Sequence, residues 1–552
     1  MPAYALALAL AVTAPLLAPG YLLLRDAVST PRSYLTDAAL GLTEAAPRAL
    51  PQDFAVALAS RVLDGGVVVK LLLIAGLWLA GWGAARLAAV VVPDAGLPGQ
   101  FVAATLAVWN PYVAERLLQG HWSLLVGYGC LPWVAAAVLR LRTEPADATW
   151  WPVLFWTALA GLTPTGLMLA ATVALVTCAA PGAGRSRRLC AAVSLGAAVL
   201  GALPWLVAPV MAGSLSLTQA AGVPEFAARA EPGLGTLLSL AGLGGIWNGQ
   251  ALPASRTTLF AVVATVVLLV VVAIGVPTAV RRPGARPLLV LAAVAVVAPA
   301  LMATGPGLAA VEAVVRAVPG LGVLRDAQKW VALALPGYAV AGATTVVTLQ
   351  RRVPRVVTAT ACCLALVAVL PDLAWGVGGK VTPVRYPAGW TAAAAIVNAD
   401  PRPVAVLPPD SMRHYPWAGD APVLDPLPRW VSADVLTTGD LVIGGKTVPG
   451  EGERARDVER LVRSGADAEE LARAGVGWVV VEGGRDAQSA LALPVAFADD
   501  DVTVYRVGGE RPAASHRGVM IAAHLVWLAA LVAGAAGMIA AALARRRRGA
   551  VY

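Results

Sequence analysis

The sequence predicts a polytopic α-helical membrane protein of about twelve spans, with one soluble α/β domain before the last span. Three observations support this class. Hydrophobic residues make up 58% of the 552 positions and charged residues only 14%, too little polar surface for a soluble chain of this length. The apolar residues gather in separate segments of roughly span length. Arginines lie in short runs between those segments, as expected of cytoplasmic loops, so the net charge of +9 does not favour a nucleic-acid partner.

The spans themselves are predicted from apolar length, since a helix needs about 20 residues to cross a bilayer. The first segment is too long, and too poor in N-terminal positive charge, for a good cleavable signal peptide, so we expect it to be a span. The predicted spans are residues 3–24, 67–91, 99–113, 123–139, 150–163, 167–180, 189–212, 258–279, 287–303, 330–349, 355–371 and 517–544.

The arginine runs predict the orientation of these spans. Keeping every run on the cytoplasmic side requires residues 150–180 to enter and return, with Thr163-Pro164-Thr165-Gly166 as the turning point. Two short spans or a re-entrant pair would both satisfy this rule. The runs are Arg140/Arg142, Arg185/Arg187/Arg188, Arg281/Arg282/Arg286, Arg351/Arg352/Arg355 and Arg545–Arg548.

This orientation places the protein in the cell membrane with both termini cytoplasmic. A multi-span membrane domain covers residues 1–371, an extracytoplasmic α/β domain 372–516, the final span 517–544 and a basic cytoplasmic tail 545–552. The predicted outer segments are 25–66, 114–122, 213–257, 304–329 and 372–516.

Within residues 380–510 the charge density rises and apolar runs shorten. We predict strands at Pro403–Leu407 and Asp440–Ile443 and helices at Glu453–Gly465 and Asp467–Gly475. Residues 476–481 form a continuous apolar run, which is typical of a buried parallel strand. The segment is long enough to hold its own core.

Gly445-Lys446-Thr447 resembles the end of a phosphate-binding loop. That motif requires a glycine five residues before Gly445, where this chain has Asp440. A hairpin turn is the better interpretation, and no nucleotide site is expected.

Acidic residues in the first outer segment are the first functional candidates. Asp26 follows the predicted first span directly, and Asp37 and Asp53 lie further along the loop. An acid at the membrane interface can act as a general base or hold a metal ion on a phosphate. Solvated loop charges are the alternative.

The second candidate group follows Asn110-Pro111, which we expect to break the helix. Glu115, Arg116 and His121 then gather at the outer interface, where polar groups are costly unless paired or facing a cavity. An arginine and a histidine can bind a phosphate, whereas a Glu115–Arg116 surface pair is the alternative.

The third candidate group is Arg325 and Lys329, two cations at the start of a predicted span. Cations at the headgroup level suit a lipid-linked phosphate or a pyrophosphate. Side chains that merely anchor the helix are the alternative.

The layout and several short stretches resemble the GT-C superfamily of membrane glycosyltransferases, and in particular a group of GT-C-like envelope proteins. The resemblance implies an aspartate of the first outer loop as base or metal ligand, which matches Asp26 first and then Asp53 and Asp37. A paired Asp-Asp or Asp-x-Asp, found in some GT-C enzymes, is missing here. The stretches that carry the resemblance are Pro19-Gly20-Tyr21 through Asp26, Pro47-Arg48 to Asp53, Trp109-Asn110-Pro111 through Trp122, and Arg325-Asp326 with Lys329.

On this resemblance we expect a transferase that moves a sugar from a polyprenyl-phosphate donor to an envelope glycan or glycolipid. The donor phosphate would be held by Arg116, His121, Arg325 and Lys329. The cofactor is left open, with a divalent cation at Asp26 as the candidate. A non-catalytic relative that binds lipid-linked glycans is the alternative. A transporter or flippase ranks last, because no proton relay or inverted pair of broken helices is found.

Overall fold

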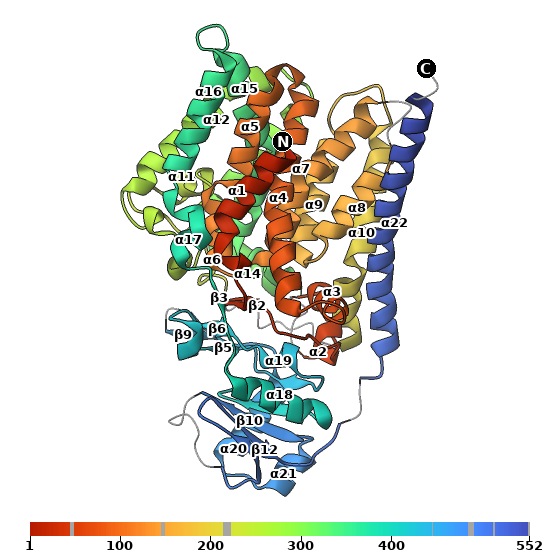
Figure 1. Ribbon diagram of the computed structural model, residues 1–552, viewed down its shortest axis with the longest axis vertical. Coiled ribbons are helices and arrows are strands. Elements are labelled where there is room, and N and C mark those ends of the chain that lie inside the picture. Colours follow the sequence, from red (N-terminus) through yellow and green to blue (C-terminus); the bar gives the residue numbers. More distant parts are fainter. Residues whose placement is uncertain are drawn as a thin grey trace.

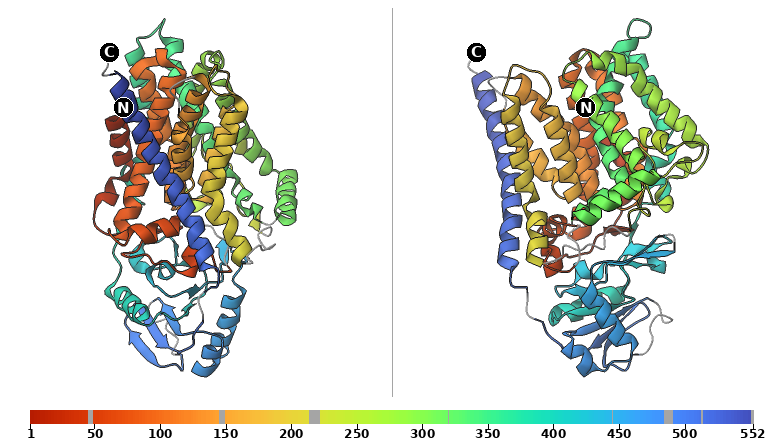
Figure 2. Two further views of the ribbon diagram at one scale, coloured as in Figure 1. Left: turned by 90° about the vertical axis from the view of Figure 1, so that its right-hand side faces the viewer. Right: turned by 180° about the vertical axis from the view of Figure 1, so that it is seen from behind.

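The computed structural model describes residues 1–44, 49–144, 149–212, 222–318, 320–443, 445–483, 491–511 and 514–549. A helical bundle forms one part, and a smaller strand-containing region lies beyond one end of it (Figure 1). The last helix, α22, begins beside that region and runs along the bundle to its far end (Figure 2). Pro47 and Arg48, which carry part of the resemblance, lie outside the described residues.

The bundle is built from apolar helices of unequal length. Within the described residues, six are long and apolar enough to cross a membrane, or up to eight if two bent pairs each count as one span. These several apolar helices indicate a membrane protein. The main helices are α1 (Pro2–Thr13), α4 (Gly65–Val91), α5 (Gly96–Val108), α7 (Trp122–Thr143), α8 (Trp151–Ala160), α9 (Pro164–Thr177), α10 (Arg187–Ala212), α12 (Phe260–Val280), α13 (Arg286–Met302), α15 (Leu335–Leu349), α16 (Arg355–Ala368) and α22 (Arg517–Gly549).

The predicted count of about twelve spans is not confirmed. Helices α5, α8 and α9 have only 13, 10 and 14 residues, shorter than the roughly 20 needed for a crossing. The predicted turn between α8 and α9 is present, and Thr163 caps α9 by accepting the Gly166 N–H at 3.0 Å. The predicted loop 304–329 also contains a helix, α14 (Gly305–Ala317), bent by 93° from α13.

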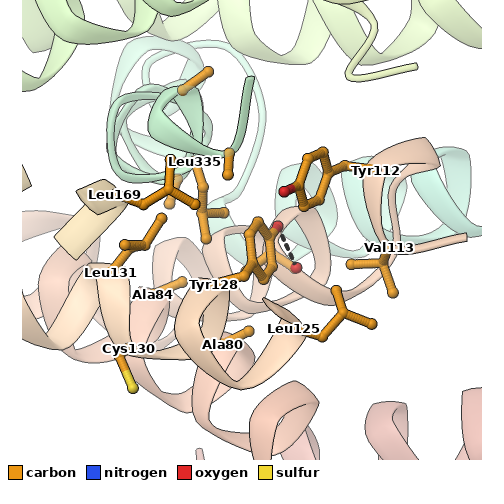
Figure 3. Close-up of a cluster of buried hydrophobic side chains, with 14 of the residues drawn as sticks. Ala80, Ala84, Tyr112, Val113, Leu125, Tyr128, Cys130, Leu131, Leu169 and Leu335 are labelled. Carbon is orange, nitrogen blue, oxygen red and sulfur yellow. Dashed lines mark hydrogen bonds between the residues drawn. The ribbon is translucent and has the colours of Figure 1, made fainter. Parts of the chain in front are cut away.

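Small residues let the helices at the centre of the bundle approach closely. At Gly129 of α7 an added Cβ would lie 2.2 Å from the Gly76 carbonyl oxygen of α4, so only glycine fits. Beside this contact, Tyr112 and Tyr128 stack with ring centroids 5.2 Å apart in the apolar core (Figure 3). This packing holds the segment that carries Tyr112 against the bundle.

Arginines of the predicted runs bond to neighbouring loops of the bundle. Arg142 at the end of α7 donates to the Ala180 carbonyl at 3.0 Å and also bonds to the Arg185 carbonyl. Arg282 pairs with Asp94 in the loop between α4 and α5. The C-terminal end of α22 lies at the end opposite the strand-containing region (Figure 1).

The strand-containing region centres on a five-stranded mixed sheet of order β11-β12-β10-β4-β7. Strand β10 is parallel to β4 and antiparallel to β12, and β4 is parallel to β7. The strands are β1 (Tyr21–Leu24), β2 (Ala27–Val28), β3 (Pro383–Val384), β4 (Val404–Leu407), β5 (Met412–Arg413), β6 (Val423–Leu424), β7 (Val435–Leu436), β8 (Leu441–Ile443), β9 (Lys446–Val448), β10 (Trp478–Glu482), β11 (Val495–Ala498) and β12 (Val502–Arg506).

Helices cover both faces of this sheet, which explains the continuous apolar run of β10. Trp478 and Val480 face α18 (Ala388–Ala399) in one core, whereas Val479 and Val481 face α20 (Glu453–Arg463) and α21 (Ala468–Arg473) in another. The predicted strand at 476–481 and both predicted helices are confirmed within a few residues. Asp467 caps α21 in a capping box.

The hairpin interpretation of Gly445-Lys446-Thr447 is also confirmed. Strands β8 and β9 pair antiparallel, and Gly445 has a φ of 80° in the turn. The strand predicted at 440–443 is therefore present, but it belongs to this separate hairpin and not to the main sheet.

The prediction of one helical span over residues 3–24 is wrong in its second half. The α-helix ends at Thr13, a 3₁₀ turn ends at Leu17, and residues 21–24 form β1. Strand β1 pairs with β2 on one side and with β3 on the other. The first residue of β3, Pro383, lies 359 residues after the last residue of β1, Leu24. Pairing with a distant strand buries Leu22 and Leu23, so their apolar character reflects a sheet and not a membrane span.

Candidate functional site

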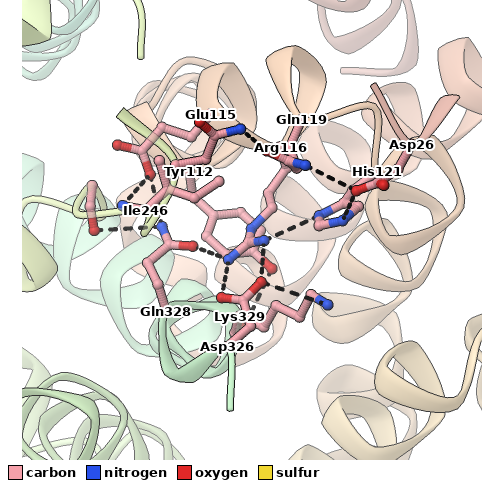
Figure 4. A network of polar contacts seen from close by, with 12 residues as sticks. Asp26, Tyr112, Glu115, Arg116, Gln119, His121, Ile246, Asp326, Gln328 and Lys329 are labelled. Atoms are coloured by element: carbon pink, nitrogen blue, oxygen red, sulfur yellow. Dashed lines mark hydrogen bonds and ion pairs between the residues drawn. The ribbon is translucent and has the colours of Figure 1, made fainter. Parts of the chain in front are cut away.

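A cluster of charged side chains lies beside the turn at which Arg25 bonds to the Pro422 carbonyl of the strand-containing region. Its polar contacts are drawn in Figure 4. Its members come from the β1–β2 turn, from helix α6 (Pro111–Leu118) and its C-terminal turn, and from the chain before α15. All five predicted outer segments meet around it, since Arg25 also contacts residues of the 213–257 and 372–516 segments. We call this group the Asp26 cluster; it consists of Asp26, Arg116, Gln119, His121, Asp326, Gln328 and Lys329.

Asp26 occupies the second position of a two-residue hairpin turn between β1 and β2. The first position, Arg25, has a φ of 49°, which is unusual and strained for a residue with a side chain. Its buried guanidinium donates to the carbonyls of Leu118 at 2.6 Å and Gln250 at 2.8 Å. These two hydrogen bonds fix the conformation of the turn, so that Asp26 points toward α6 and its C-terminal turn.

Gly120 makes this approach possible. It has a φ of 83°, and an added Cβ would lie 2.3 Å from both the Leu24 carbonyl oxygen and the Ala27 nitrogen. The Asp26 N–H donates to the Gln119 carbonyl at 3.1 Å across the same contact. Any larger residue at position 120 would push the hairpin away from the cluster.

Helix α6 begins as the Asn-Pro pair predicts, because Asn110 accepts the Val113 N–H at 3.1 Å. Arg116 of this helix is fully buried and donates both terminal nitrogens to Asp326, at 2.8 and 3.0 Å. It also bonds to Gln328, and its guanidinium lies 5.5 Å from the Tyr112 ring centroid. Arg116 is therefore the structural centre of the cluster.

His121 links Arg116 to Asp26. Arg116 donates to Nδ1 at 3.0 Å, and because arginine cannot accept, Nδ1 must carry a lone pair. The proton then lies on Nε2, which donates to Asp26 Oδ2 at 3.0 Å. Burial lowers the pKa of His121, and the neighbouring Lys329 and Arg116 add to this, so a neutral histidine orients Asp26 at ordinary pH.

Asp26 itself is a carboxylate. Burial acts to raise its pKa, but hydrogen bonds from His121 and Gln119 and the charge of Lys329 lower it below the usual value. Gln119 also donates to Oδ2, at 2.9 Å, so the two side-chain contacts that the described residues make to Asp26 use the same oxygen and leave Oδ1 without one. With 40% of its side chain exposed, Asp26 is the most open charged member of the cluster.

Lys329 is the cation that remains available. Its ammonium lies 3.5 Å from Asp326, its only ion-pair partner among the described residues, and 22% of its side chain is exposed. Burial acts to raise the pKa of Asp326, but the charges of Arg116 and Lys329 lower it well below its usual range. Asp326 thus stays ionised and holds Lys329, whose charge also acts on Asp26.

The alternative of a Glu115–Arg116 surface pair is wrong. Both side chains are fully buried and each has its own partners. Glu115 accepts the N–H groups of Gly245 at 3.1 Å and Ile246 at 3.2 Å and the Gln328 amide at 2.9 Å. It therefore fastens the 222–257 segment to the cluster.

Three predicted site residues lie elsewhere. Asp37 pairs with Arg517 at the start of α22 and accepts the Ala514 N–H at 3.0 Å. Asp53 pairs with Arg429 at 3.2 Å. The Arg325 guanidinium lies 4.9 Å from the Phe226 ring centroid, away from Lys329, which turns to Asp326.

Sequence reasoning assigned no role to Asp326, Gln328 or Gln119. The signal for Asp326 was present, since an acid between Arg325 and Lys329 at a bundle end needs cationic partners. In the described ranges, no group of three or more His, Cys, Asp or Glu side chains could hold a metal ion. The metal-ligand role of Asp26 stays a prediction, with His121 as its nearest potential co-ligand.

Comparison of the chain with protein families, with curated proteins and with solved structures found no match.

Proposed function

We propose that this protein is a membrane glycosyltransferase that transfers a sugar from a polyprenyl-phosphate donor to an envelope glycan or glycolipid. The observation that carries the proposal is the oriented, partly exposed carboxylate of Asp26 and the ammonium of Lys329, both held by one hydrogen-bonded frame around Arg116. A base and a cation held together at the end of an apolar bundle suit a substrate with a lipid chain, a phosphate and a reacting hydroxyl.

In the proposed reaction, the acceptor hydroxyl passes its proton to Asp26 Oδ1 and its oxygen bonds to the anomeric carbon. The bond between that carbon and the phosphate oxygen breaks, and the electron pair leaves with the polyprenyl phosphate. Lys329 stabilises the charge that grows on this leaving group. Arg116 acts through Asp326 and His121, which it holds in place, whereas the phosphate role of Arg325 stays a prediction.

The orientation of the chain is part of this proposal. We place the Asp26 cluster and residues 372–516 on the outer face of the cell membrane and both termini in the cytoplasm, with the short helices completing about twelve crossings. Reporter fusions at Gly450 and Tyr552 should then report opposite sides of the membrane. The same side for both would contradict this orientation.

The test of the reaction is Asp26→Asn in a strain whose own copy is deleted. The change keeps the size of the side chain and its contacts but removes the negative charge, and loss of a general base costs about 10²–10⁴-fold in rate. Envelope glycan synthesis should fail while the protein level, followed by immunoblot, stays normal.

Asp37→Asn and Asp53→Asn are the matched controls, because both acids lie in the same loop but are paired with arginines elsewhere. Both variants should lower synthesis by no more than the roughly tenfold loss expected of one binding contact, far less than Asp26→Asn. If all three variants restore it fully, the transferase is excluded and a non-catalytic protein that binds lipid-linked glycans takes its place.

A further inference from the structure

A second polar site lies apart from the Asp26 cluster, in a cavity of about 630 Å³. Its walls are helix α2 (Asp37–Leu40), the start of α3 (Gln52–Ala59), the start of α22 and the loop and edge strand around β7. This volume lies within the range of about 300–1,000 Å³ typical of small-molecule sites. We infer that this cavity binds an uncharged saccharide, the glycan acceptor if the proposed transferase function holds.

The charges of the lining point to a neutral ligand. Among the described residues that line it, five are acidic and four are arginines, so neither sign dominates. A phosphate would meet the carboxylates, and a polycation would meet the guanidinium groups. The acidic residues are Asp37, Glu44, Asp53, Asp425 and Asp434, and the basic residues are Arg429, Arg454, Arg511 and Arg517.

The arrangement of these charges favours hydroxyl groups. Asp53 pairs with Arg429 and Asp37 with Arg517, so that an acceptor oxygen and a donor nitrogen lie side by side on the wall. A sugar hydroxyl donates and accepts at once, and neighbouring hydroxyls match such a pair. Asp53 and Arg429 each keep 17% of the side chain exposed, which leaves them accessible from the cavity.

The buried acid of the wall belongs to an internal network. Asp425 is only 2% exposed, and its Oδ2 lies 3.6 Å from Arg413, which also pairs with Glu482. A peptide is a poorer fit, because edge strand β7 spans only Val435–Leu436 and offers too short a template for strand addition.

The cavity is also joined to the Asp26 hairpin. Leu424 lines the cavity, and its N–H donates to the Arg25 carbonyl at 2.8 Å. A glycan held in the cavity would therefore contact the strand that supports the turn carrying Asp26. This continuity is the reason for assigning the acceptor, and not the lipid donor, to the cavity.

The test uses the full-length protein in lipid nanodiscs on an array of uncharged oligosaccharides, with uronic-acid and amino-sugar oligosaccharides of equal length beside them. We expect binding to uncharged chains. Thr437→Trp fills the cavity and should weaken binding at least about tenfold, whereas Thr437→Ser, the matched control, should change it little. Arg429→Gln does not fill the cavity but removes a charge-assisted donor, which should also cost about tenfold.

The results that would overturn the saccharide site differ from those that would overturn the transferase function. Binding to charged oligosaccharides only, binding to none, or equal binding by wild type and both cavity variants overturns the saccharide site. Asp26→Asn should bind the array normally in either case. Lost binding in Thr437→Trp together with full glycan synthesis by Asp26→Asn would keep the saccharide site and reject the transferase.

Discussion

The Asp26 cluster and the cavity beside it both contain arginine–carboxylate pairs, but the two regions hold them differently. The Arg116–Asp326 pair is almost completely buried, with side-chain exposures of 0% and 7%. The Asp53–Arg429 pair keeps 17% of each side chain exposed and borders an open volume. A buried pair must be complete, because either partner alone is a desolvated charge, whereas a half-exposed pair can exchange its partner for water or ligand.

The same difference in burial distinguishes residues that position other side chains from residues that bind a ligand. In the Asp26 cluster the buried pair builds a fixed frame for His121 and Lys329, and Asp26 and Lys329 are its two most exposed charged side chains. In the cavity, the paired side chains themselves form the accessible surface. The following predictions test whether burial is the property that divides the two regions.

The largest effect is expected at Arg116. Arg116→Met leaves Asp326 buried without its bidentate partner, which should destabilise the protein by about 3–5 kcal/mol. The measurement is the thermal unfolding midpoint of the detergent-solubilised protein. The double variant Arg116→Met/Asp326→Leu should recover much of the loss, since it removes both charges. A double variant as unstable as the single one would contradict this account.

A smaller effect is expected at Glu482, in the buried network of Arg413, Tyr415 and Asp425. Burial and the nearby Asp425 raise the pKa of Glu482 to about 8. The folded state therefore holds a proton that the unfolded state releases near its ordinary pKa of about 4.5. This contribution to stability is fully present below about pH 4.5 and is lost as the pH rises through about 8.

The direction of this pH dependence is tested by the unfolding midpoints of the wild type and Glu482→Gln between pH 5 and pH 9. The wild type should lose stability as the pH rises, and the variant should show a flatter profile because its amide does not titrate. Asp434, whose pKa burial and Asp37 raise to about 6, gives a residual slope of the same sign. Parallel profiles for the two proteins would rule out Glu482 as the titrating group.

The smallest effect is expected at the half-exposed pair. Arg429→Gln should change the free energy of unfolding by no more than about 1 kcal/mol, because water can solvate Asp53 once the arginine is gone. The same unfolding assay applies, and Asp53→Asn should behave alike. A loss as large as that of Arg116→Met would show that exposure does not explain the difference between the two regions.

Local chemistry along the chain was enough to predict much of this structure. The long apolar segments predicted helices such as α4, α7 and α22, because burial of apolar side chains in lipid or core depends on composition over some 20 residues. Asn110-Pro111, Thr163-Pro164 and the Asp467 capping box fixed helix ends, since caps and proline act within one turn. The apolar run before Glu482 predicted the central strand for the same local reason.

Only the tertiary structure decided the rest. Residues 21–24 have the apolar character of a helix end, yet pairing with β3 makes them a strand, and that partner lies far along the chain. Asp26, Asp37 and Asp53 are alike in the sequence, but Asp26 alone meets His121, because Arg25 and Gly120 bring its turn against the end of α6. Arg325 and Lys329 are one helical turn apart, yet Asp326 and Phe226 draw them to different sides. The sequence determines which groups carry charge, whereas contacts between distant segments determine which of them are buried, paired or left open.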